Sequence, residues 1–196
     1  MRISVPRSTL VRKEIVGHLC DVFRSHGYEG TTMAVLSQAT GLQKASLYHH
    51  FPGGKNEMLE TAVLATIVEL ERRVFRFLDT NDDAAERIAQ ILEGFETYTD
   101  GGRRSCLLAV IAQSSVAENF KSRIGAQFSA WITRLSTTLV EFGHGPKRAD
   151  TLALETLETL YGSLVVGRLL GTFEIFDLGL QRCRTNIGLA DKIEFS

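Results

Sequence analysis

The composition of this 196-residue chain already excludes several classes of protein. Hydrophobic residues make up 44% of it, enough for a continuous core, and its cysteines stand far apart at Cys20, Cys106 and Cys183. No Cys-x-x-Cys pair occurs, which argues against a zinc site and a disulfide framework. The N-terminus lacks the apolar run of a signal peptide, and no segment reaches the ~20 apolar residues that cross a bilayer. We therefore expect a soluble, cytoplasmic protein with no membrane partner.

Charge is distributed unevenly along the chain. The formal net charge is −1, yet residues 1–55 carry seven basic and three acidic side chains, a net charge of +4 that leaves −5 for the remainder. A basic segment ahead of an acidic body suits an anionic partner at the N-terminal end only. Charge alone equally allows a chance clustering of solvated side chains.

Apolar residues recur at helical spacing along the chain, and no strand pattern or tandem repeat interrupts them. The predicted fold class is therefore all-α, with about nine helices. The first helix carries an apolar face and is expected to end at Gly27. The residues of that face are Leu10, Ile15, Leu19, Val22 and Phe23.

Residues 31–51 have the pattern of a helix-turn-helix. Thr31 and Thr32 can cap a short helix, and Gly41 suits a turn with positive φ. Leu42 and Leu47 can then hold a second short helix to the core. Pro52-Gly53-Gly54 ends that helix. Five polar groups are left to project outward, namely Gln43, Lys44, Ser46, Tyr48 and His49.

The remaining helices follow from spacing and caps. A long helix is expected from the Gly53-Gly54 break to Leu78, and the next from a capping box at Asp83 to Gly101. A short, buried helix is expected over residues 106–112. Three further helices are expected over residues 115–142, 147–170 and 173–187.

Several of these residues together resemble the DNA-binding domain of TetR-type repressors. They are Thr31-Thr32, Gly41-Leu42, the run from Lys44 to Phe51, and Lys55. The resemblance covers about the first quarter of the chain, with Ser37 and Gln43 standing where many members have Ala and Ser. It implies a three-helix DNA-binding domain over residues 1–52 and a helical ligand-binding and dimerisation bundle over residues 53–196. The implied partners are double-stranded operator DNA, a small-molecule effector and a second copy of the chain.

Roles at the DNA divide by chemistry. The amide of Gln43 can pair with adenine, and Lys44 can bind guanine or a phosphate. Ser46 can reach either a base or a phosphate. The resemblance implies phosphate contacts that fix register without reading sequence. These fall on Thr32, Tyr48, His49 and Lys55.

The C-terminal bundle carries aromatic and polar residues that could line an effector site. Ordinary core packing explains most of the aromatics, while a mostly apolar bundle with a few polar groups is also how ligand sites are built. The candidates are Phe75, Phe95, Tyr98, Cys106, Gln113, Phe128, Trp131, Tyr161 and Arg168. Cys106 follows Arg103-Arg104, whose charges favour a thiolate, so an oxidant or electrophile sensor at Cys106 is an alternative to inert packing.

The last two helices have more apolar surface than one exterior face requires, and small residues permit close helix contact. The resemblance implies a dimer built from these helices. The expected interface residues are Thr159, Ser163, Val166, Gly167 and Phe176.

Catalytic equipment is absent from the sequence. No zinc-protease, nucleophile-elbow or phosphate-loop motif occurs, and the adjacent His49 and His50 point about 100° apart on a helix, too far to share a metal ion. We expect no enzyme activity, cofactor or metal. The sequence favours a repressor released from its operator by a small hydrophobic or aromatic effector. The alternatives are a redox-sensing repressor, a ligand-independent DNA-binding structural protein and, third, a helical-bundle enzyme.

Overall fold

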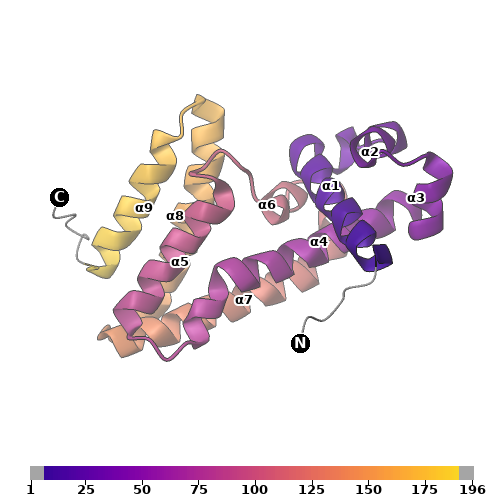
Figure 1. Ribbon diagram of the computed structural model, residues 1–196. Helices are drawn as coiled ribbons and strands as arrows, with labels where there is room; N and C mark the ends of the chain where they lie inside the picture. Colours follow the sequence, from indigo (N-terminus) through magenta and orange to yellow (C-terminus); the bar gives the residue numbers. More distant parts are fainter. Residues whose placement is uncertain (1–6, 190–196) are drawn as a thin grey trace. The chain divides into compact units, whose positions relative to one another are not determined.

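The computed structural model describes residues 7–189, with side chains from Arg12 onward. Over this range the chain is helical and contains no strand (Figure 1), so the all-α prediction is confirmed. The side chain of Leu10, predicted to lie on the apolar face of the first helix, is outside what the structure describes. The elements are α1 (Arg7–Gly30), α2 (Met33–Thr40), α3 (Lys44–His50), α4 (Gly54–Arg73), the 3-10 helix η1 (Phe75–Asp79), α5 (Ala84–Thr99), α6 (Leu107–Ile111), α7 (Ala117–Phe142), α8 (Pro146–Leu170) and α9 (Glu174–Ile187).

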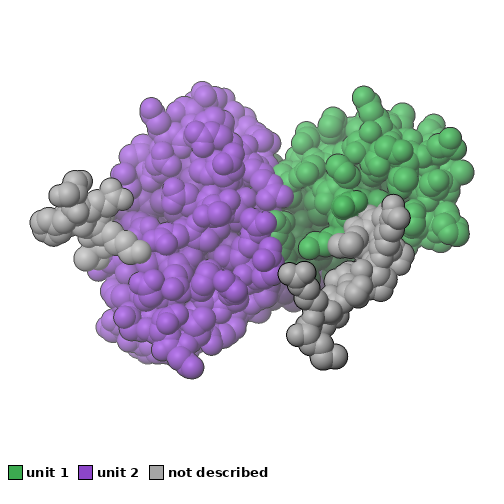
Figure 2. Space-filling view, viewed as in Figure 1, with its two compact units in different colours: residues 1–69, 106–121 green, residues 70–105, 122–196 purple. Residues whose placement is uncertain are grey.

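The chain divides into two compact units (Figure 2). The first comprises residues 1–69 and 106–121, and the second comprises residues 70–105 and 122–196. The first unit extends past the predicted boundary at residue 52 because most of α4 belongs to it and α6 packs on α1. This division describes packing, and the functional boundary after residue 52 remains a prediction.

The first unit is organised around the apolar face of α1. Its described members, among them Leu19 and Phe23, are buried, as the spacing predicted. At Gly27 the backbone leaves the helical region with φ 65° and ψ −175°, and a further turn follows to Gly30. Helix α1 packs on α2, and Cys20 of α1 donates through Sγ to the carbonyl of Ala62 in α4. The same unit buries further apolar residues between α2 and α4, namely Leu36, Leu47, Phe51, Met58 and Leu59.

The prediction that α4 continues to Leu78 is wrong. The helix ends at Arg73, and Val74 has φ −120° and ψ −65° before η1 begins. The cause is a close approach by α5: a Cβ on Gly94 would lie 2.5 Å from the carbonyl oxygen of Arg73. Since this contact depends on tertiary packing, the helical spacing of the sequence does not reveal it.

The second unit contains α5, α8, α9 and most of α7. The predicted cap of α5 is confirmed, because Asp83 Oδ1 accepts a hydrogen bond of 2.9 Å from the amide of Glu86. Helices α8 and α9 lie side by side (Figure 1), and a Cβ on Gly179 would lie 2.7 Å from Ser163 Oγ. Among the described helices, none is both long and apolar enough to cross a membrane.

Candidate nucleic-acid interface

The turn of the helix-turn-helix is fixed by hydroxyl groups and one glycine. Thr32 Oγ1 caps α2 by accepting from the amide of Val35 at 3.3 Å. Gly41 has φ 67°, the left-handed conformation that favours glycine. The hydroxyl of Ser37 donates to the carbonyl of Leu42 across the turn. Ser37, a departure from the family pattern, therefore stabilises the turn that positions α3.

Helix α3 has a buried side and an open side. Leu47 and Phe51 are fully buried. On the open side Gln43, Lys44 and His49 are exposed, and their side chains form no hydrogen bond or ion pair within the described residues. Side-chain amides and ammonium groups without an internal partner are the groups that can meet base edges and phosphates. Three of the predicted DNA-contacting residues are thus accessible in the structure.

The other residues predicted to contact DNA differ in their exposure and in their contacts within the protein. Tyr48 is 48% exposed, and its ring lies against Gly54, where a Cβ would be 3.3 Å from Tyr48 Cε1. Ser46 is half-buried, and the exposed Thr32 already uses its hydroxyl as a helix cap. A phosphate contact from Thr32 would therefore share the capping hydroxyl or use its backbone amide.

Lys55 is engaged within the protein. Its Nζ donates to the carbonyl oxygens of Tyr28 and Thr31, each at 3.0 Å, and lies 3.9 Å from the centre of the Tyr28 ring. The first turn of α4 also has an internal acceptor, because Glu57 Oε2 accepts from the amide of Gly53 at 2.7 Å. Lys55 thereby holds α4 to the last turn of α1 and to Thr31, a positioning role that the sequence did not indicate.

The same connection is held from a second side by Glu29. Its carboxylate accepts a 2.7 Å hydrogen bond from the amide of Ser115, between α6 and α7. The hydroxyl of Ser115, followed by its amide, lowers the pKa of the Glu29 carboxyl. The chain leading into α2 is thus fixed by Lys55 and Glu29 together.

Comparison with known proteins bears directly on this site. A model of bacterial regulatory proteins of the TetR family matches residues 19–62, which span the helix-turn-helix. The chain is also 30% identical over 162 residues to the nucleoid occlusion factor SlmA of Vibrio vulnificus, covering 78% of this chain and 81% of that protein. The chain belongs to the TetR family. It is accordingly a DNA-binding transcriptional regulator, and the resemblance found in residues 31–55 is confirmed.

Further relatives agree with this assignment. The chain is 24% identical over 160 residues to the HTH-type transcriptional regulator YxaF of Bacillus subtilis, covering 80% of this chain and 81% of that protein. A crystal structure of a TetR transcriptional regulator from Chloroflexus aurantiacus has a TM-score of 0.77 at 21% identity. It covers 93% of this chain and 96% of the other. The TetR fold therefore extends beyond the helix-turn-helix over nearly the whole chain.

Six of the residues predicted to line the effector site of this TetR-family protein form one aromatic cluster in the second unit. Phe75 stacks on Trp131 with ring centres 4.1 Å apart, and Trp131 lies 5.3 Å from Phe128. Tyr161 lies 5.2 Å from both Phe128 and Phe95. Tyr98 completes the cluster, 6.3 Å from Phe95. The structure thus brings together the aromatic part of the predicted site.

The remaining three effector candidates are not aromatic and are not members of this ring cluster. Cys106 and Gln113 belong to the first unit, and Gln113 is exposed and bonded to the carbonyl of Ala109. Arg168 is exposed near the end of α8. The thiol of Cys106 is buried, with 1% of the residue exposed.

The five residues predicted for the dimer interface differ in their exposure to solvent. Ser163, Gly167 and Phe176 are buried inside the single chain, and Thr159 is half-buried. A Cβ on Gly167 would lie 2.8 Å from the carbonyl of Thr172, so this small residue serves the contact of α8 with the chain leading into α9. Val166 alone among the five is exposed, at 44%. Other exposed apolar residues nearby, which the sequence prediction left out, are Val165, Leu169, Leu170, Phe173 and Leu178.

Two further cysteines are held as neutral thiols by burial. Burial raises the pKa of Cys183 to about 11, and it also raises the pKa of Cys20. Cys20 Sγ donates to the carbonyl of Ala62 at 3.5 Å. Metal ligands do not gather either, since residues 7–189 hold no group of three His, Cys, Asp or Glu side chains suited to an ion.

Proposed function

We propose that this TetR-family regulator is a repressor that binds double-stranded operator DNA as a homodimer and leaves it when a small effector binds. The observation that carries the proposal is the open side of α3. The side chains of Gln43, Lys44 and His49 are exposed and form no hydrogen bond or ion pair within the described residues, while Leu47 of the same helix is buried. A recognition helix needs this combination, because base-edge contacts require free polar groups on a rigid support.

The division of labour at the operator follows from the chemistry of each group. Gln43 presents an amide that can pair bidentately with adenine, and Lys44 can donate to guanine or to a phosphate. His49, Ser46, Tyr48 and Thr32 supply phosphate contacts that set register. Lys55 contributes by holding α4 in place, since its ammonium already has two carbonyl partners.

Homodimerisation is supported by an exposed apolar strip at the end of α8. Val166, Leu169, Leu170 and Phe173 follow one another at intervals of three or one residues, and Leu169 is 80% exposed. Leaving such a strip in water is unfavourable, and a second copy of the same strip would cover it. The strip therefore replaces the small residues of α8 as the proposed centre of the dimer contact.

An effector site in the second unit is supported by its aromatic cluster. Phe128 and Tyr161 are half-buried, and Trp131 Nε1 donates to Glu71 Oε2 at 2.8 Å, which adds a charged group to an apolar setting. Sites for small hydrophobic or aromatic molecules combine these features. No observation favours the redox alternative, since Cys106 is buried.

A second candidate function comes from one of the comparisons. The 30% identical relative from Vibrio vulnificus is named as a nucleoid occlusion factor rather than as a transcriptional repressor. This likeness favours a DNA-binding role that is independent of an effector, such as marking chromosomal DNA.

The positions of bound sites on the genome separate the two candidates. Fragments bound by the purified protein should be selected and sequenced, and transcription from the adjacent promoters measured with and without the gene. A repressor predicts a few sites that overlap promoters whose transcription rises when the gene is deleted. Many dispersed sites without a change in transcription would favour the structural role.

A further inference from the structure

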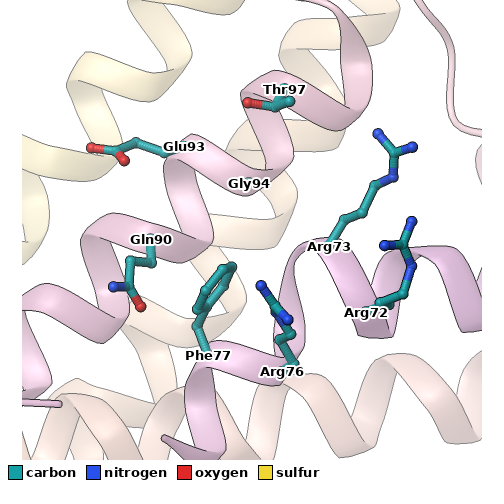
Figure 3. A pocket seen from close by; sticks show the side chains of 8 residues that line it. All are labelled: Arg72, Arg73, Arg76, Phe77, Gln90, Glu93, Gly94 and Thr97. Carbon is teal, nitrogen blue, oxygen red and sulfur yellow. The ribbon is translucent and has the colours of Figure 1, made fainter. Parts of the chain in front are cut away.

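An open groove of about 420 Å³ lies in the second unit, where the end of α4 and η1 meet α5. Figure 3 shows three arginines on the side of α4 and η1, with polar residues of α5 opposite and the Phe77 ring between Gln90 and Arg76. The volume lies within the ~300–1,000 Å³ typical of small-molecule sites. The lining residues are Arg72, Arg73, Arg76, Phe77, Gln90, Glu93, Gly94 and Thr97.

Part of the positive charge of the groove has no ion-pair partner within the described residues. Glu71 and Asp79, two acids of the same segment, are both paired with Arg134, at 2.9 and 2.5 Å. Arg72 and Arg76 form no ion pair within the described residues. Two guanidinium groups therefore stand at the groove without an internal anion.

The single acid of the lining does not reverse this balance. Glu93 lies 4.0 Å from Arg184 of α9, so its charge is shared with a cation outside the groove. Arg72 and Arg76 alone outnumber this one carboxylate, so the lining keeps a net positive charge. Guanidinium groups bind carboxylates and phosphates through paired N–H donors, which makes an oxyanion the fitting occupant.

The groove also has an apolar wall and a buried acceptor. The Phe77 ring lies 4.8 Å from the Arg76 guanidinium carbon and forms one side. Gln90 donates through Nε2 to Glu86 at 3.1 Å, while its buried Oε1 has no hydrogen-bond partner. A buried acceptor without a donor is costly, so a ligand hydroxyl or amine that reached it would be favoured.

A purely structural reason for the arginines accounts for only part of this arrangement. Basic side chains near a helix C-terminus interact favourably with the helix dipole, which explains Arg72 and Arg73. Arg76 lies beyond the end of α4, in η1. The dipole also gives no reason for the unpartnered acceptor of Gln90.

We propose that this groove binds a small organic anion. Its carboxylate or phosphate lies between Arg72 and Arg76, and its ring or apolar chain lies against Phe77. The proposal rests on the proposed function in one respect, that the bound anion is the effector. It then moves the effector site from the aromatic cluster to this groove, and it changes the class of effector from a neutral hydrophobic molecule to an anion.

Calorimetric titration of the full chain without DNA tests the binding step. The probes are benzoate and phenyl phosphate, with benzyl alcohol as the neutral analogue and inorganic phosphate as the anion without a ring. We expect saturable binding of at least one aromatic anion at millimolar concentrations or below. The double variant Arg72→Gln/Arg76→Gln should weaken it at least tenfold, about 1.4 kcal/mol. Arg182→Gln, which removes an exposed arginine of α9 outside the groove, should leave it unchanged.

Three results would overturn the site. They are the absence of saturable binding by both aromatic anions, equal binding by the double variant and wild type, and binding of benzyl alcohol as tight as that of benzoate. If inorganic phosphate binds as tightly as phenyl phosphate, the proposed contact between Phe77 and the ring of the ligand is overturned. Circular dichroism melting verifies that the variants fold.

Operator binding separates this inference from the proposed function. A saturating aromatic anion should weaken operator affinity of the wild type and have no effect on the double variant. If the anion binds in the groove but operator affinity does not change, its role as effector is overturned. If no aromatic anion binds while the protein still recognises an operator, the groove proposal fails and the regulator assignment stands.

Discussion

The ammonium of Lys55 lies 3.9 Å from the centre of the Tyr28 ring and donates to the Tyr28 carbonyl at 3.0 Å. One side chain of α4 is thus held by both the ring and the backbone of the residue that follows the Gly27 break. Thr31, the second carbonyl partner of Lys55, lies two residues before the start of α2. We therefore expect the position of α2 and α3 to depend on this contact within the protein.

Lys55→Met should lower the free energy of unfolding by about 1–2 kcal/mol, because it removes two charge-assisted hydrogen bonds and a cation–π contact. It should also weaken binding to operator and to random duplex to a similar extent, since it disturbs the residues that position α3 rather than the residues that contact bases. Urea denaturation and binding titrations measure the two effects. Lys44→Met is the matched control for the stability measurement, because Lys44 is exposed and its side chain forms no hydrogen bond or ion pair within the described residues. A Lys55→Met variant as stable as Lys44→Met would contradict this role.

The exposed strip on α8 makes a prediction about assembly. The wild type should be a dimer at micromolar concentration, and Val166→Glu should dissociate it, because an unpaired carboxylate buried at a symmetric contact costs several kcal/mol. Sedimentation equilibrium measures the change. Thr151→Glu places the same charge at an exposed polar position of α8 and should leave the dimer intact. A monomeric wild type, or a dimer that persists in Val166→Glu, would contradict the strip as the dimer contact.

Burial of Cys183 predicts a stability change at alkaline pH. Its pKa is raised from 9.0 to about 11, so the folded protein holds the thiol proton more tightly than the unfolded chain does. This contribution is complete below pH 9, and it is lost as the pH rises from about 9 towards 11. Urea denaturation at both ends of this range should show a smaller decline for Cys183→Ala than for the wild type. Equal declines in the stability of the wild type and of Cys183→Ala would contradict the role assigned to the Cys183 thiol.

The parts of this fold that the sequence predicted are those that depend on local chemistry. Thr32, Gly41 and Asp83 act within a few residues of themselves, as a cap, a left-handed turn and a cap. The end of α4 escaped prediction because it depends on Gly94 of another helix. Spacing alone carried the helical pattern past Arg73 to Leu78.

The sequence predicted some parts of the candidate sites and not others, because some depend on a local motif and others on tertiary contacts. Exposed polar residues of α3 follow from the motif, but the internal partners of Lys55 follow only from coordinates. A small residue such as Gly167 predicts a close contact without indicating whether the partner is the same chain or a second copy. Arg72 and Arg76 attracted no functional prediction, since basic residues near a helix end are common.

The most direct test of the central claim concerns Gln43 and the reading of sequence by α3. Gln43→Ala should cost about 1–3 kcal/mol per half-site on the selected operator and relax base preference at one symmetric position. Binding to a random duplex should not change, nor should the slope of log affinity against log salt, since no phosphate contact is lost. Gln38→Ala, the same substitution at an exposed glutamine of α2, serves as the control. The measurement is a salt series on operator and random duplex for wild type and both variants. A loss confined to the operator agrees with sequence reading by Gln43, whereas equal losses on the two duplexes would contradict it.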